Sequence, residues 1–64
     1  MYNLITAKIL HRTASNVVVK DGRQYTVCDL EGNAMNMLGG GKRGLAEAIR
    51  SADFSAEIAK AWGI

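Results

Sequence analysis

The sequence predicts one small α+β domain, a three-stranded antiparallel meander followed by helix. Two observations carry this prediction. Strand-forming residues with polar and apolar alternation fill the first half, and apolar residues at three- and four-residue steps fill the second half. A chain of 64 residues buries only about 60% of the surface that its unfolded form exposes. We therefore expect residues 1–64 to form a single domain around one core.

The three strands are expected over residues 2–10, 17–20 and 24–28. Apolar and polar residues alternate in the first, which is typical of a half-buried strand. The polar segment 11–16 is expected to be a turn. Asp21-Gly22 lies between the second and third strands, and Asp-Gly is a favoured two-residue hairpin turn.

The second half is expected to hold one long helix over residues 33–51 and a short C-terminal helix over residues 55–62, with a break between them. Asn33 is a suitable N-cap for the long helix. Glycines interrupt its apolar stripe, and each costs roughly 0.5–1 kcal/mol relative to alanine inside a helix. The stretch is therefore either one continuous helix with a glycine face or a helix broken by a glycine loop. The preserved spacing favours the continuous helix.

Charge and composition exclude several classes of protein. Eight Lys and Arg against six Asp and Glu give a net charge of +2, spread evenly over both halves. This excludes a polybasic tail and an acidic nucleic-acid mimic. A hydrophobic fraction of 48% excludes a disordered chain. No apolar run approaches the roughly 18 residues of a membrane span, and no signal peptide is recognisable, so we expect a cytoplasmic protein of a bacterial host.

Few residues suggest catalysis. One cysteine, Cys28, and one histidine, His11, form neither an internal disulfide nor a zinc site. No spacing joins them, or the carboxylates of the second half, into a nucleophile–base or acid–base set. We therefore predict no enzyme, no metal and no cofactor. An enzyme built on His11 and Cys28 is the least supported alternative.

The glycine-rich basic segment 39–44 is the sharpest candidate site. Exposed backbone N–H groups, a helix N-terminus and two cations together favour an anion such as a phosphate. The segment is not a Walker loop, which needs Lys and Ser or Thr after its last glycine. The competing interpretation is a glycine-faced helix with two solvated cations. The predicted phosphate- or nucleic-acid-binding residues are Gly40, Gly41, Lys42, Arg43 and Arg50, with Arg12 and Arg23 as further cations.

A second predicted surface binds a protein partner through Met35, Met37 and Trp62. Methionine side chains adapt to different partners, and tryptophan is a frequent interface anchor. The competing interpretation places all three in the core.

Two resemblances bear on function. The residues Asn33-Ala34, Leu38-Gly39, Arg43-Gly44-Leu45 and Ala48 resemble a helix of small phage-encoded proteins of unknown function. This resemblance covers residues 33–48 and implies a phage or prophage origin and one continuous helix. Three strands followed by Gly41-Lys42-Arg43 also resemble double-stranded-RNA-binding domains, which place a basic helix start on phosphates.

These observations lead to a functional expectation. We expect a small non-enzymatic binding protein of phage or mobile-element type that blocks or sequesters a host component. The host component could be part of an anti-phage defence, and we name a CRISPR effector or a signalling nucleotide as the specific targets of this prediction. The alternative is a phosphate- or nucleic-acid-binding module that uses segment 39–44. Because the chain is so small, we also expect a homo-oligomer, with a homodimer as its simplest form.

Overall fold

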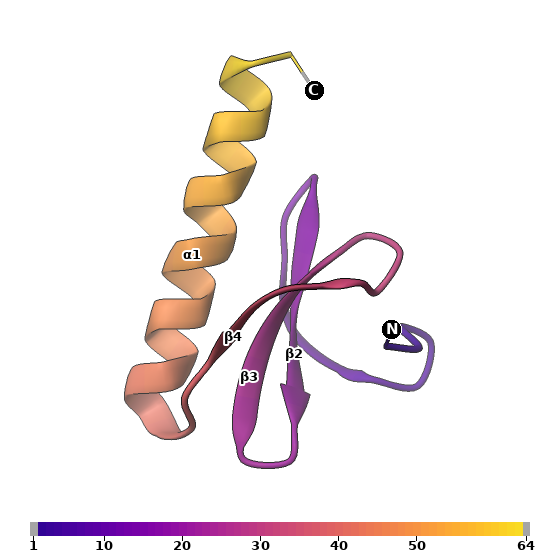
Figure 1. The fold of residues 1–64 in the computed structure, drawn as a ribbon, viewed down its shortest axis with the longest axis vertical. Helices are drawn as coiled ribbons and strands as arrows, with labels where there is room; N and C mark the ends of the chain where they lie inside the picture. Colours follow the sequence, from indigo (N-terminus) through magenta and orange to yellow (C-terminus); the bar gives the residue numbers. More distant parts are fainter. Residues whose placement is uncertain (1, 64) are drawn as a thin grey trace.

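The computed structural model describes residues 2–63, which form a four-stranded antiparallel sheet and one long helix (Figure 1). The strands follow one another in the sheet in the order β1-β2-β3-β4. The predicted α+β class is confirmed. The elements are β1 (Lys8–Arg12), β2 (Asn16–Asp21), β3 (Gln24–Asp29), β4 (Ala34–Leu38) and α1 (Gly41–Ala61).

The fourth strand lies where the sequence predicted the start of a helix. Met37 pairs with Thr26 and Leu38 with Tyr25, so β4 extends the sheet beyond β3. The predicted helix over residues 33–51 is therefore wrong in its first part, as is the continuous helix over residues 33–48 that the phage resemblance implied. Pairing with β3 overrides the helical preference of Ala, Met and Leu, because strand formation depends on tertiary context.

The helix is single and continuous, so the predicted break and the separate C-terminal helix over residues 55–62 are wrong. Two polar side chains at the predicted break, Ser51 and Asp53, form bonds to the sheet. Asn36 Nδ2 donates to Ser51 Oγ at 3.4 Å, and His11 Nε2 lies 2.7 Å from Asp53 Oδ1. Gly44, Ala48 and Ala52 are the buried residues of the helix, and their spacing of four places them on one face that runs across the predicted break.

The strand boundaries also shift. The predicted first strand over residues 2–10 is a strand only from Lys8, and the predicted turn over residues 11–16 starts later because β1 continues to Arg12. The β2–β3 hairpin is present, but its two-residue loop is Gly22-Arg23, since Asp21 pairs with Gln24. Only the first loop position has a positive φ, Gly22 at 62°, as in a hairpin turn with glycine first.

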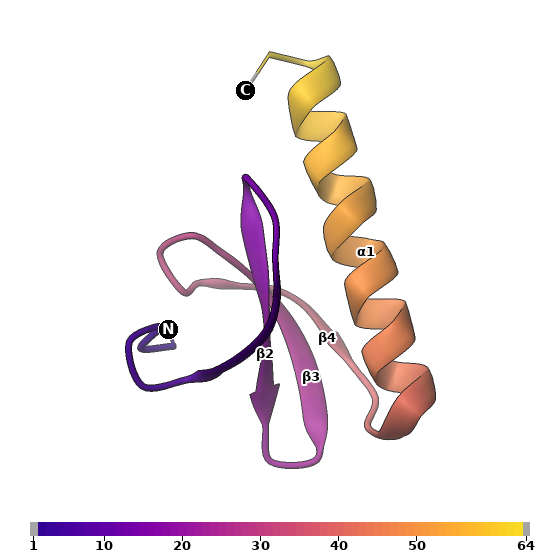
Figure 2. The ribbon, with the colours of Figure 1, turned by 180° about the vertical axis from the view of Figure 1, so that it is seen from behind.

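The sheet is covered on both faces (Figures 1 and 2). On one face, Val18 and Val27 pack against the buried alanines of α1. On the other, Val17, Val19 and Cys28 are fully buried under apolar side chains of the N-terminal segment 2–7 and of β1. The covering residues are Tyr2, Leu4, Ala7 and Ile9. The segment is held at its start, where the Tyr2 N–H donates to the Gly32 carbonyl at 2.8 Å.

One buried polar side chain ties the sheet to the middle of the helix. Asn16 is fully buried at the start of β2. Its Nδ2 donates to the Ala52 carbonyl at 3.0 Å, and its Oδ1 accepts from Thr13 Oγ1 at 2.7 Å. Buried amides are stable only when such bonds are formed, so this pair of bonds fixes how α1 sits on the sheet.

A single carboxylate organises the β3–β4 loop. Asp29 Oδ1 accepts from the backbone N–H groups of Glu31 and Asn33, each at 2.9 Å. The Asn33 side chain donates to Asp29 Oδ2 at 3.1 Å. Led by the Asn33 N–H, these donors hold the pKa of the Asp29 carboxyl below its ordinary value.

The bonds of Asp29 in the β3–β4 loop are expected to make the folded protein less stable at acid pH. Because the folded pKa of Asp29 is below the unfolded one, its contribution is present above the unfolded pKa of about 3.9. It is lost as pH falls through the folded value. In thermal melts we expect Asp29→Asn to lower the melting temperature at neutral pH and to reduce its decline between neutral and acid pH.

Glu57→Gln is the matched control, since Glu57 is an exposed carboxylate on the helix. An acid profile that is unchanged in Asp29→Asn would contradict the role given to Asp29.

Candidate functional site

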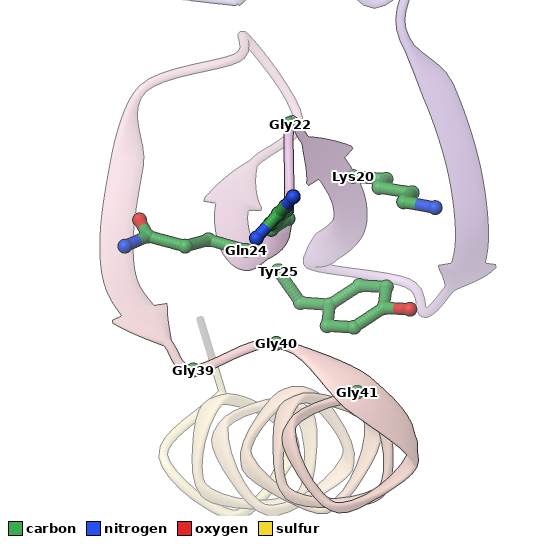
Figure 3. Close-up of a pocket in the computed structure, with 8 residues that line it drawn as sticks. Lys20, Gly22, Gln24, Tyr25, Gly39, Gly40 and Gly41 are labelled. Atoms are coloured by element: carbon green, nitrogen blue, oxygen red, sulfur yellow. The ribbon is translucent and has the colours of Figure 1, made fainter.

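A cleft of about 600 Å³ lies between the β2–β3 hairpin and the loop that leads into α1 (Figure 3). The Tyr25 ring lies over the glycine loop, and the Lys20 side chain extends to the same side as the tyrosine hydroxyl (Figure 3). This is expected, because Lys20 and Tyr25 are cross-strand partners. The lining residues are Lys20, Gly22, Arg23, Gln24, Tyr25, Gly39, Gly40 and Gly41.

The glycines allow the loop to approach the hairpin. A Cβ on Gly40 would lie 2.0 Å from the Arg23 carbonyl oxygen, and Gly41 has a φ of 78°. A Cβ on Gly44 would lie 1.7 Å from the Gly39 carbonyl oxygen. Both sequence interpretations hold in part: Gly39 and Gly40 form a loop before the helix, and Gly44 lies on the buried face of the helix.

Positive charge converges on the cleft from two elements. Lys20 and Arg23 line it from the hairpin, and Lys42 and Arg43 follow in the exposed first turn of α1. That turn contains no acidic residue, and its N-cap forms no side-chain hydrogen bond. Helix N-termini carry partial positive charge and unpaired N–H groups. The helix dipole and the two cationic side chains therefore both add positive charge at this end of α1.

The carboxylate that lies between Lys20 and Gly22 in the sequence is already bonded. Asp21 Oδ2 accepts from the Tyr2 hydroxyl at 2.8 Å. Tyr2 packs on the sheet face opposite the helix, so this bond holds the Asp21 carboxylate toward that face.

The predicted phosphate-binding residues are brought together only in part. Gly40 and Gly41 line the cleft. Lys42 and Arg43 adjoin it on the helix, without being lining residues. Arg50 lies about 12 Å further along the helix, in a separate hollow with Phe54.

Of the two further predicted cations, Arg12 and Arg23, only Arg23 lies at the cleft. Arg12 pairs with Val17, at the end of the β1–β2 pair away from the hairpin. Arg23 lines the cleft, as does Lys20, which the sequence interpretation missed. The available signal for Lys20 was its place beside Asp21-Gly22, across the turn from Arg23.

The predicted partner-binding residues are exposed but do not form one surface. Met35, Met37 and Trp62 are 54%, 59% and 77% exposed. Met37 pairs with Thr26, whose hydroxyl contacts Tyr2 on the sheet face away from the helix. Trp62 is the C-cap residue of α1, at the end of the helix away from the glycine loop.

His11 and Cys28 are also kept apart. His11 pairs with Val18 and reaches Asp53 on the helix side of the sheet. Cys28 is buried on the other side, where burial raises the pKa of its thiol. Within residues 2–63, no three His, Cys, Asp or Glu side chains gather as a metal site. Over the same residues, no helix combines the length and apolar character needed to cross a membrane.

Comparisons with protein-family models, with curated protein sequences and with solved structures found no match for this chain.

Proposed function

We propose that this chain is a non-enzymatic binding protein whose basic cleft takes phosphate groups of a nucleic acid. The convergence of Lys20 and Arg23 with the start of α1 across one cleft carries the proposal. Backbone N–H groups at a helix start bind phosphate oxygens, and an arginine guanidinium binds them through two parallel bonds.

Tyr25 gives the cleft a second component. Its half-buried ring forms a wall beside the glycine loop (Figure 3). Aromatic rings next to cationic grooves stack on the bases of single strands with little sequence preference. We therefore expect affinity for single-stranded RNA or DNA to be at least as high as for a duplex.

The test is fluorescence anisotropy with labelled single- and double-stranded oligonucleotides over a range of salt concentrations. Affinity of the unaltered protein is expected to fall steeply with salt, because phosphate contacts release counterions. Lys20→Ala/Arg23→Ala removes two of these contacts. It is expected to weaken binding about tenfold or more and to lower the slope of log affinity against log salt by about two.

The matched control is Arg12→Ala/Lys60→Ala, which removes the same net charge from exposed positions outside the cleft. We expect it to retain most of the affinity. An equal loss of affinity in both double variants would contradict the assignment of the cleft as the binding site. The absence of salt-dependent binding by the unaltered protein would contradict it as well.

A second proposed function is that of a blocking protein, encoded by a phage, that sequesters a protein or signalling nucleotide of its bacterial host. It is supported by large apolar side chains that remain exposed, among them Ile5 at 94% and Trp62 at 77%. A pull-down from bacterial lysate at low and high salt separates the two functions. A discrete protein retained by Lys42→Glu/Arg43→Glu at high salt supports the blocker. Nucleic acid that is lost at high salt and in Lys42→Glu/Arg43→Glu supports the cleft.

A further inference from the structure

The strand β4 forms an edge of the sheet that contains neither a charged residue nor a proline. It pairs with β3 on one side, and within residues 2–63 no strand pairs with its other side. No charged residue and no proline occurs from Gly32 to Gly41. Natural edge strands are commonly protected by lysine, proline or a bulge. The bulge near Ala34 leaves the pairing of Asn36 to Leu38 with β3 regular.

The opposite edge of the same sheet differs. β1 begins with Lys8, ends with Arg12 and contains His11. Charged side chains at an edge discourage pairing with another strand. The two edges of one small sheet thus differ in charge, which is one of the features that discourage pairing with a further strand.

Apolar side chains lie on both sides of the β4 edge. Met37 projects on the face opposite the helix. On the helix side, Asn36 reaches Ser51, which marks the flank of α1 nearest to β4. Phe54 and Ile58 continue this flank at helical spacing and are 62% and 42% exposed. The bond between His11 and Asp53 marks the flank nearest to β1.

We propose that a second copy of this chain covers the edge, with β4 pairing antiparallel to the β4 of the partner across a two-fold axis. The two-fold rotation then covers Met37 on the sheet face opposite the helix and the Phe54–Ile58 flank of α1 on the helix face. Residues near a two-fold axis meet their own copies. An uncharged edge suits that arrangement, whereas a charged edge would repel itself.

Exposed apolar area at this edge supports this occupant. Aromatic side chains bury 150–250 Å² each, so Phe54 offers roughly 100–150 Å² at its exposure. The β4 backbone, Met37 and Ile58 add to this toward the roughly 800 Å² per partner of a specific interface. Among residues 2–63, the fully buried hydrophobic residues are only valines, alanines and one cysteine. Domains with so small a core are commonly stabilised by association.

The test is sedimentation equilibrium at several protein concentrations. The unaltered chain is expected to be a dimer. Met37→Lys and Met37→Glu each place like charges across the axis and are expected to weaken self-association about tenfold or more. An equimolar mixture of the two variants is expected to restore the dimer, because opposite charges then meet. This rescue also shows that neither variant is merely misfolded.

Ile5→Lys is the matched control, since Ile5 is an apolar side chain exposed to 94% in the N-terminal segment. It is expected to leave the dimer intact. A monomer at all concentrations of the unaltered chain would overturn the proposal. So would Met37 variants that dimerise as tightly as the control.

Discussion

Replacing Gly44 by alanine is expected to cost about 3 kcal/mol or more in free energy of unfolding. Alanine in place of glycine inside a helix usually stabilises by about 1 kcal/mol. Here the sign reverses, because the new Cβ would lie 1.7 Å from the Gly39 carbonyl oxygen. Backbone cannot yield as a flexible side chain does, so α1 must move off the loop or off the sheet. Overpacking costs about 1–3 kcal/mol even where side chains can adjust.

Such a loss is large for this chain. At about 0.05–0.15 kcal/mol per residue, a domain of 64 residues has a total stability of roughly 3–10 kcal/mol. Urea denaturation followed by circular dichroism measures the difference. Gly39→Ala is the control, because its Cβ would meet nothing within 4 Å. A Gly44→Ala protein as stable as this control would show that the loop does not pack on the first helical turn.

Replacing Asn16 by aspartate is expected to destabilise by about 3–5 kcal/mol, because it leaves a buried charge without a partner. The change also removes the Nδ2 donor and sets a carboxylate oxygen against the Ala52 carbonyl. Thr13 Oγ1 still donates to the other oxygen, which does not offset the buried charge. Asn16→Ala, which removes both bonds without adding charge, is expected to cost less, about 1–3 kcal/mol.

Asn3→Asp is the matched control for this chemical change. Asn3 is exposed, and its Oδ1 only accepts a bond, from the Ile5 N–H at 3.0 Å. We expect thermal and urea denaturation to leave Asn3→Asp close to the unaltered protein. If Asn16→Asp behaves in the same way, Asn16 is not the buried link between β2 and α1.

The meander was predictable where local signals agree. Residues 17–19 are β-branched and Asp21-Gly22 follows them, so the second strand and its hairpin were found to within one residue. The first strand was overextended, because alternation in segment 2–7 also suits a segment that lies over a sheet face. Periodicity alone does not separate these two cases.

The fourth strand and the unbroken helix needed tertiary information. Ala34, Met37 and Leu38 fit a helical stripe and are good helix formers, yet pairing with β3 decides their conformation. Ser51 and Asp53 have the residue types of a helix cap. Their partners, Asn36 and His11, lie 15 and 42 residues away, beyond the reach of any local pattern.

The candidate site was likewise predictable only where its signal was local. The glycine-rich segment was recognisable because its composition is local, whereas Lys20 and Arg23 reach the cleft only when the hairpin folds beside it. Arg50 was assigned to the site from its charge, but helical rise carries it away from the cleft.

The strand order has a consequence for how the chain reaches its native state. Because every strand pairs with its neighbours in sequence, each hairpin closes a short loop, and low contact order favours fast folding. The bonds from Asn16 to Ala52 and from His11 to Asp53 span 36 and 42 residues. Loop-closure entropy places them after the hairpins. On this basis we expect the sheet to be the template on which the helix docks last.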